Sequence, residues 1–178
     1  MNNIFAAFVI FYLLNGIVYL YAIMRLIIKE KSYGAVEFLP KPFVSVIVPA
    51  RNEARTINKC IDCLINQEYP DGQFEIIPVN DASTDGTEEL IDNIAENNRK
   101  VRPIHIAYHS RGNKGKINAI DQGIQYAKGE IIITTDADIW MEPGWLNQMV
   151  AGFDKETGLV IGMTLDEYSN HPVHAFQA

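Results

Sequence analysis

The sequence is poor in cysteine, with two in 178 residues, Cys60 and Cys63. Two cysteines cannot build a disulfide framework, and a zinc site would need two further ligands close by. Redox-active Cys-x-x-Cys pairs lie at the start of a helix, which stabilises the thiolate. These cysteines fall in the middle of the amphipathic segment 54–67, so we predict that they pack in the core. The four histidines also lack a neighbouring ligand set, and we predict them to be structural or exposed.

The chain also lacks an excess of positive charge. It has 15 Lys and Arg residues against 22 Asp and Glu residues, which gives a net charge of −7. Sequence-independent binding to nucleic acid needs a basic surface, so we expect no nucleic-acid partner. An anionic ligand would have to be met locally, by a metal ion, a helix N-terminus or a few cations.

Charge is missing altogether from the N-terminal run at residues 4–28 until Arg25. A helix of this length crosses the ~30 Å of hydrocarbon in a bilayer. A signal peptide would have a basic start, a shorter apolar core and a small-residue cleavage site, and this run has none of these. We therefore predict a retained transmembrane helix at residues 1–28, single-pass in this chain. Because Arg25, Lys29 and Lys31 follow the apolar run, the positive-inside rule predicts that the rest of the chain is cytoplasmic.

A linker is predicted at residues 29–42, where a glycine and two prolines interrupt any helix. After it, short apolar strands alternate with amphipathic helices, which predicts an α/β domain with a mostly parallel sheet and helices on both faces. Asp85 and Glu88 are spaced like a capping box at the start of the second helix. The predicted strands are 43–48, 74–80, 101–107, 131–135 and 158–164, and the predicted helices are 54–67, 85–98, 116–128 and 144–153.

Unusual polar clusters follow each of the first four predicted strands. They read "PARNE", "NDAS", "HSRGNKGK" and "DAD" in chain order. The carboxyl ends of parallel strands meet at one edge of the sheet, and open α/β sheets bind their ligands beyond that edge. The sequence therefore predicts that the four clusters form a single site.

The "DAD" cluster carries Asp136 and Asp138, two residues apart. On extended backbone both side chains point the same way, and convergent carboxylates suit a hard divalent ion such as Mg²⁺ or Mn²⁺. Such an ion would keep positions open for phosphate oxygens. A solvated strand end or a helix cap would use the same residues, so the pattern alone leaves both interpretations open.

The other clusters offer groups that suit a nucleotide. Asp81 could accept a hydrogen bond from a base or a sugar hydroxyl, and Glu53 could hold a ribose or a neighbouring arginine. Arg51 could equally be a surface charge. Lys116 follows a glycine-rich stretch at a helix start, where it could meet a diphosphate, although the spacing is not that of a Walker loop and a simple capping loop is the alternative. For residues 83–85 we predict a turn and a helix cap.

Taken together, the segments "SVIVPARNEA", "VNDASTDGT", "GNKGKINAIDQGI" and "GEIIITTDADI" closely resemble the family 2 glycosyltransferases of GT-A fold. The resemblance covers about residues 43–165. It implies a Rossmann-like, nucleotide-sugar-binding domain over residues 43–178 that is incomplete at its C-terminus. The residues that match the family's binding motifs are Pro49, Ala50 and Glu53 in the nucleotide-binding turn, Asp81 for uracil, Lys116 in the Gly-Lys motif, Asp136 near the ribose and Asp138 for the metal.

The resemblance implies an inverting, metal-dependent glycosyltransferase anchored in the cell (inner) membrane. The donor would be a UDP-linked sugar, and the acceptor a cell-surface polysaccharide or a lipid-linked glycan. The family's catalytic base lies downstream of the "DAD" motif, so we expect it beyond Ala178 and assign no catalytic residue.

Two alternatives differ in class. One is a nucleotide-sugar-binding module without turnover, which the missing base would produce. The other is a phosphatase similar to the haloacid dehalogenases, in which Asp136 would be phosphorylated. That family requires Thr or Val at the position of Trp140, and the earlier motifs have no place in it.

Overall fold

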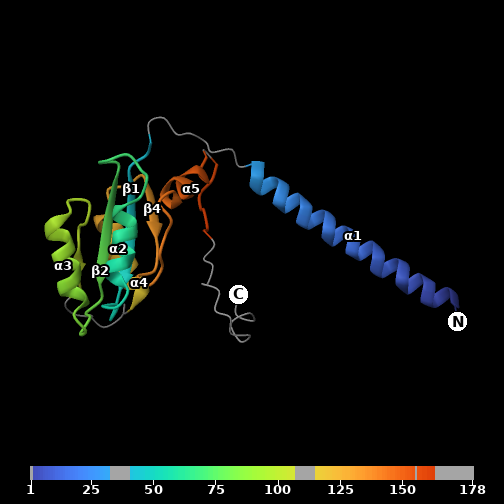
Figure 1. Cartoon of the computed structure of the whole chain (residues 1–178), viewed down its shortest axis with the longest axis horizontal. Coiled ribbons are helices and arrows are strands. Elements are labelled where there is room, and N and C mark those ends of the chain that lie inside the picture. Colours follow the sequence, from blue (N-terminus) through green and yellow to red (C-terminus); the bar gives the residue numbers. More distant parts are fainter. Residues whose placement is uncertain (1, 33–40, 107–114, 155, 163–178) are drawn as a thin grey trace. The chain divides into compact units, whose positions relative to one another are not determined.

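The computed structural model describes residues 2–32, 41–106, 115–154 and 156–162. The chain divides into two compact units, Met1–Val36 and Glu37–Ala178. The first unit contains the helix α1 (Asn2–Ser32), drawn in blue in Figure 1. Its stretch Phe8–Arg25 is long and apolar enough to cross a membrane, and none of it is buried. The predicted apolar helix is therefore present.

The second unit is built on a parallel sheet with the strand order β3-β2-β1-β4. The strands are β1 (Val44–Ala50), β2 (Phe74–Asn80), β3 (Ile104–His105) and β4 (Ile131–Thr134). Between and after them come the helices α2 (Ile57–Ile65), α3 (Thr87–Asn97), α4 (Lys116–Tyr126) and α5 (Trp145–Ala151). The α/β class and the parallel sheet are as predicted. A helix between two consecutive strands crosses over the sheet and returns the chain to the same edge, so the strands pair in parallel.

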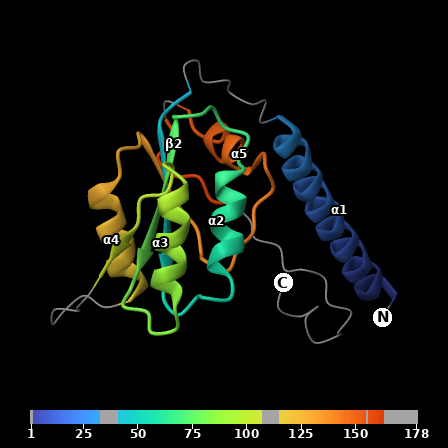
Figure 2. The same cartoon turned by 60° about the vertical axis from the view of Figure 1, so that its left-hand side comes forward.

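Helices cover both faces of this sheet. On one face, side chains from α2, α3 and α5 pack with alternate residues of β1, such as Val46 and Val48. Figure 2 shows α2 and α3 running side by side on this face. On the other face Ile47 and Ile77 pack against Ala119 of α4. The buried strands are apolar on both sides, as expected for a sheet that lies between two helical layers.

Two predicted strands differ in the structure. The third, predicted at residues 101–107, is reduced over its described part, residues 101–106, to β3 and an isolated bridge between Val101 and Ile76. Pro103, which has no N–H to donate, separates the two. The fifth, predicted at residues 158–164, is not a strand over its described part, residues 158–162, and Leu159 and Ile161 there are exposed. No strand pairing reaches those residues, and apolar alternation forms a strand only where a neighbour supplies hydrogen bonds.

A buried carboxylate joins the strands near their amino ends. Glu75 lies opposite Ser45 in the register of β1 and β2, and it accepts hydrogen bonds from the Ser45 hydroxyl at 2.7 Å and the Lys128 N–H at 2.8 Å. Arg102 forms an ion pair with its second oxygen. Burial alone would raise the pKa of Glu75, but the hydrogen bonds from Ser45, Arg102 and Lys128 together lower it. This network fixes the end of the sheet opposite the predicted site.

We expect Glu75→Gln to lower the free energy of unfolding at pH 7 by about 1.5–3 kcal/mol, the contribution of hydrogen bonds to a charged group. The folded-state pKa of Glu75 lies below its usual value of 4.5, so this stabilisation is complete above pH 4.5 and is lost as the pH falls further. Urea unfolding across this range measures both effects. The control is Asp71→Asn, which removes an exposed partner of Lys100 and should change stability by less than about 1 kcal/mol. Equal losses in the two variants would contradict the expectation.

Helix α4 approaches β1 closely at Gly123. A Cβ atom at Gly123 would lie 2.5 Å from Cγ2 of Ile47, which is fully buried. We expect Gly123→Ala to destabilise the domain by about 1–3 kcal/mol through overpacking, although alanine is the better helix former. Gly144→Ala is the matched control, since its Cβ would meet its nearest atom at 3.7 Å. Thermal unfolding of both variants measures the difference, and a Gly123→Ala protein of unchanged stability would show that α4 can shift away from the sheet.

Candidate functional site

A cavity of about 320 Å³ opens at the carboxyl ends of β1, β2 and β4. Its size is in the range of small-molecule sites. Its lining includes every residue for which the sequence predicts a binding role: Pro49, Ala50, Glu53, Asp81, Lys116, Asp136 and Asp138. Arg51, Gly115, Ala119 and Ala137 also line it. The structure thus gathers the predicted residues around one cavity, and their individual roles stay predictions.

Asp81 lies at the floor of this cavity, and its side chain is only 3% exposed. Its N–H donates to the Ala50 carbonyl at 2.9 Å, which extends the pairing of β1 and β2 by one residue. The Arg51 guanidinium lies 3.5 Å from the Asp81 carboxylate. Arg51, which the sequence left open as a surface charge, therefore offsets the charge of a buried acid in the site.

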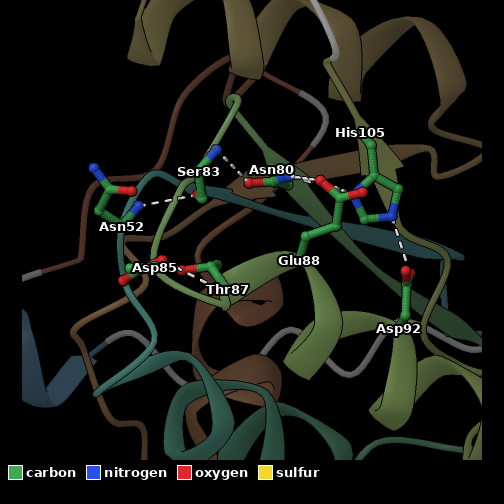
Figure 3. Close-up of polar contacts among 8 residues, drawn as sticks. All are labelled: Asn52, Asn80, Ser83, Asp85, Thr87, Glu88, Asp92 and His105. Atoms are coloured by element: carbon green, nitrogen blue, oxygen red, sulfur yellow. Dashed lines mark hydrogen bonds and ion pairs between the residues drawn. The ribbon is translucent and has the colours of Figure 1, made fainter.

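The loop between β1 and α2 is held by the loop between β2 and α3 (Figure 3). The N–H groups of residues 52–54 all donate to side chains of the second loop or of Thr87, the first residue of α3. In chain order their acceptors are Ser83 Oγ at 3.0 Å, Thr87 Oγ1 at 2.9 Å and Asp85 Oδ2 at 3.0 Å. In return, Oδ1 of Asn52 accepts the Thr84 N–H at 2.9 Å. We call the three acceptors Ser83, Asp85 and Thr87 the inter-loop clasp.

The predicted capping box is wrong. Helix α3 begins at Thr87, after Gly86 with a φ of 92°, so its start lies beyond Asp85. Asp85 accepts the Thr87 N–H at 3.1 Å with one oxygen and the Ala54 N–H with the other. Hydrogen bonds from Thr87 and Ala54 lower the pKa of Asp85. Glu88 bonds to Asn80 and does not turn back to Asp85. The capping-box pattern considers only neighbouring residues, whereas Asp85 accepts a hydrogen bond from a loop about 30 residues away in the chain.

Asn80, at the end of β2, is fully buried and joins three elements. Its amide donates to Glu88 on α3 at 2.8 Å, and its carbonyl accepts the Ser83 N–H at 3.1 Å. His105 of β3 lies 3.5 Å from the same amide and 2.9 Å from Asp92 of α3. His105 therefore has the structural role predicted for it. The other histidines, His109, His171 and His174, lie outside the described residues.

The two aspartates of the "DAD" cluster do not lie on extended backbone, which corrects the predicted geometry. Strand β4 ends at Thr134, and the Ile139 N–H donates to the Asp136 carbonyl at 3.4 Å, across a turn. Ala137, between the aspartates, is buried in the core. Both carboxylates nevertheless line the cavity, and that of Asp136 forms an ion pair with Lys116 at the start of α4.

The donor set in the cavity fits a divalent cation that is held largely by its ligand. Asp136 and Asp138 offer only carboxylate oxygens, which suit Mg²⁺ and Mn²⁺. Within the described ranges, no three His, Cys, Asp or Glu side chains converge on one point. One or two carboxylates completed by phosphate oxygens and water is a common arrangement for Mg²⁺.

Cys60 lies beneath this turn, in the core. Its thiol donates to the Asp136 carbonyl at 3.5 Å, and Cys63 packs against the same core. Both thiols are free, so the prediction of core packing is confirmed. Burial, with smaller effects from the charges of Cys63, Asp138 and Asp136, raises the pKa of Cys60 from 9.0 to about 12.

A parallel α/β sheet with a polar cavity at its carboxyl edge is the architecture of GT-A glycosyltransferases, and solved structures of this class are similar to the chain. One is the mannosyltransferase PcManGT from Pyrobaculum calidifontis in complex with GDP-Man and Mn²⁺, with 33% identity and a TM-score of 0.56 over 62% of this chain and 32% of that chain. Another is S. aureus TarS in complex with UDP-GlcNAc, with 27% identity and a TM-score of 0.52 over 61% of this chain and 30% of that chain.

The chain belongs to glycosyl transferase family 2, whose model matches residues 45–176. Its relatives include a beta-monoglucosyldiacylglycerol synthase of Nostoc, 36% identical over 65% of this chain and 24% of the relative. A chondroitin synthase of Pasteurella multocida is 33% identical over 72% of this chain and 13% of the relative. The chain thus spans a quarter or less of the length of these two relatives. The family match gives no support to the phosphatase alternative.

The burial of Cys60 predicts that its thiol is unreactive in the folded protein. At pH 8 we expect iodoacetamide to modify Cys60 only after unfolding in urea, because the thiolate is the nucleophile and burial disfavours it. Peptide mass spectrometry of native and unfolded samples measures this. Since the folded-state pKa is raised, the neutral thiol stabilises the fold fully below pH 9.0, and this contribution is lost as the pH rises towards about 12. Rapid native alkylation of Cys60 would refute the prediction.

Proposed function

We propose that the chain is the donor-binding part of a membrane-anchored glycosyltransferase. It would transfer a sugar from a UDP-linked donor to a cell-surface polysaccharide or a lipid-linked acceptor, with inversion and with a divalent metal. The observation that carries this proposal is the cavity in which Asp81, Lys116, Asp136 and Asp138 meet at the carboxyl edge of the sheet. In this cavity a buried acid could bind the nucleobase and a lysine could bind the diphosphate. The two further carboxylates could hold the metal ion that the diphosphate carries.

The nucleoside would lie over the floor of the cavity. Asp81 is buried, so a base that donates an N–H to its carboxylate would form a strong, charge-assisted hydrogen bond there. Arg51 and Glu53 flank this position, and Glu53 is held in place because its carboxylate accepts the Thr56 hydroxyl at 2.9 Å. A ribose hydroxyl could then bond to Glu53 or Asp136. The solved relatives carry both GDP-Man and UDP-GlcNAc, so the choice of UDP rests on the resemblance of the motifs.

The diphosphate would lie on the opposite wall, at Lys116. In the resting chain the Lys116 ammonium is paired with Asp136, and an arriving diphosphate would take over that ammonium. Asp138, with Asp136 beside it, would hold the Mg²⁺ or Mn²⁺. When bound, the cation would offset the negative charge that grows on the leaving diphosphate. Gly115, with a φ of 83° and open space where a Cβ would stand, leaves the wall next to Lys116 uncrowded.

The acceptor side of the reaction needs a base for the attacking hydroxyl, and none is assigned among the described residues. Following the resemblance of the motifs, we propose that the base lies downstream of the "DAD" motif. The proposed organisation is a transmembrane helix at residues 1–28, a linker at 29–42 and the transferase domain from residue 43. The positive-inside pattern supports a cytoplasmic domain. A membrane anchor suits lipid-linked or surface acceptors, and relatives named for a diacylglycerol glycolipid and for chondroitin support both acceptor types.

Calorimetric titration of UDP into the chain, with and without Mn²⁺, tests the proposal. We expect binding that depends on Mn²⁺, and we expect Asp138→Ala to weaken it by at least about tenfold because the cation loses a ligand. Titration of GDP in place of UDP tests whether the site prefers uracil over guanine.

The matched control is Asp71→Ala, which removes an exposed carboxylate that precedes β2 at the other end of the sheet. It should leave the affinity unchanged. Folded protein that binds neither UDP nor GDP at any Mn²⁺ concentration would rule out a donor site in this cavity.

A further inference from the structure

Helix α2 follows β1 at the place where open α/β sheets often bind a phosphate, on the free N–H groups at the start of the helix. In this chain the N–H groups of residues 52–54, in the loop before α2, donate to the inter-loop clasp. The helix itself begins at Ile57, and the N–H groups of Thr56 and Ile57 donate to the Glu53 carbonyl at 3.0 and 2.9 Å. One of the three acceptors, Asp85, carries a negative charge. A diphosphate placed against residues 52–54 would therefore find their N–H groups occupied and the Asp85 carboxylate beside it.

The clasp also sets the shape of the nucleoside end of the cavity. Both loops contain a residue other than glycine in the left-handed region, Asn52 with a φ of 58° and Ala82 with a φ of 52°. Residues other than glycine keep such a conformation only where surrounding contacts hold it. Here Asn52 bonds to both Ser83 and Thr84, and Ala82 lies between Asp81 and Ser83. The residues next to the two strained positions, Glu53 and Asp81, line the cavity.

Thr87 is the centre of the clasp. Its side chain is buried, its hydroxyl accepts the Glu53 N–H at 2.9 Å, and it donates to Asp85 at 2.5 Å. Through Asp85 the same hydroxyl helps to orient the acceptor of the Ala54 N–H. Removing this one oxygen would leave the Glu53 N–H without its acceptor and would remove one of the donors to Asp85, which keeps the Thr87 and Ala54 N–H groups.

We propose that Ser83, Asp85 and Thr87 are positioning residues that divide the donor site into two parts. They hold the β1–α2 loop so that Asp81 and Glu53 face the nucleoside. By occupying the N–H groups of residues 52–54, they also leave the diphosphate to Lys116 and the metal-binding aspartates. This inference rests on the proposed function, and it predicts that the nucleoside part and the diphosphate part can be weakened separately.

The test compares two ligands, UDP with Mn²⁺ by calorimetry and uridine by ligand-observed NMR, in matched variants of the whole chain. Thr87→Val replaces the hydroxyl with a methyl group of similar shape, whereas Thr87→Ser keeps it. We expect Thr87→Val to weaken UDP and uridine by the same factor, about tenfold, as for one lost hydrogen bond. Thr87→Ser should stay within about twofold of the natural chain. Lys116→Met should weaken UDP by about tenfold and leave uridine within about twofold.

The outcomes separate the two proposals. If the natural chain binds neither ligand, the proposed function fails, and this inference fails with it. If the natural chain binds both and Thr87→Val binds them equally well, or loses UDP alone, only the positioning role is refuted. Circular dichroism establishes that the variants are folded. Should Thr87→Val not fold, Ser83→Ala, in the less buried part of the clasp, should show the same parallel loss for both ligands.

Discussion

Three backbone N–H groups between β1 and α2 donate to side chains that follow β2, and the geometry of the cavity depends on these hydrogen bonds. The bond from the Glu53 N–H is partly buried, so this group would be costly to leave unpaired, whereas the bonds from Asn52 and Ala54 are exposed. The side chains that follow β2 supply the oxygens. Two loops that come from neighbouring strands are thereby locked to each other, and the acid at the end of β2 is held beneath the first loop beside Arg51.

The cavity contains cationic side chains although the chain as a whole is acidic. Its two cations are each paired with a carboxylate, Arg51 with Asp81 and Lys116 with Asp136. Arg51 is paired with a buried acid, and removing the arginine from that pair would leave a buried negative charge without its partner. The lysine pair is about half exposed, so water screens it and a competing anion can replace it at low cost. Of the two pairs, only the one at α4 is suited to exchange, which agrees with the separate parts proposed for nucleoside and diphosphate.

Much of the fold was predictable because it depends on local patterns. Apolar strands that alternate with amphipathic helices allow few arrangements, and parallel strands bring their carboxyl ends together, so residues from four separate clusters meet at one cavity. The rest depends on contacts between residues far apart in the chain. Nothing near Asp85 in the sequence indicates that it accepts the Ala54 N–H, or that Glu88 serves Asn80. Likewise, Ala137 between the two aspartates is buried in the core cluster that α2 and α5 also enter, which no local pattern encodes.

The strand pairing of the sheet also indicates the order in which the domain folds. Val44 pairs with Phe74 on one side and with Ile131 on the other, so the two halves of the cavity differ greatly in the length of chain that separates their strands. Closing the shorter connection costs less entropy and is faster. We therefore expect the parallel crossover unit of β1, α2 and β2 to form first, with the loop that carries the clasp following directly after β2. We expect β4, which leads to Asp136 and Asp138, to dock afterwards, so that this edge of the cavity is completed last.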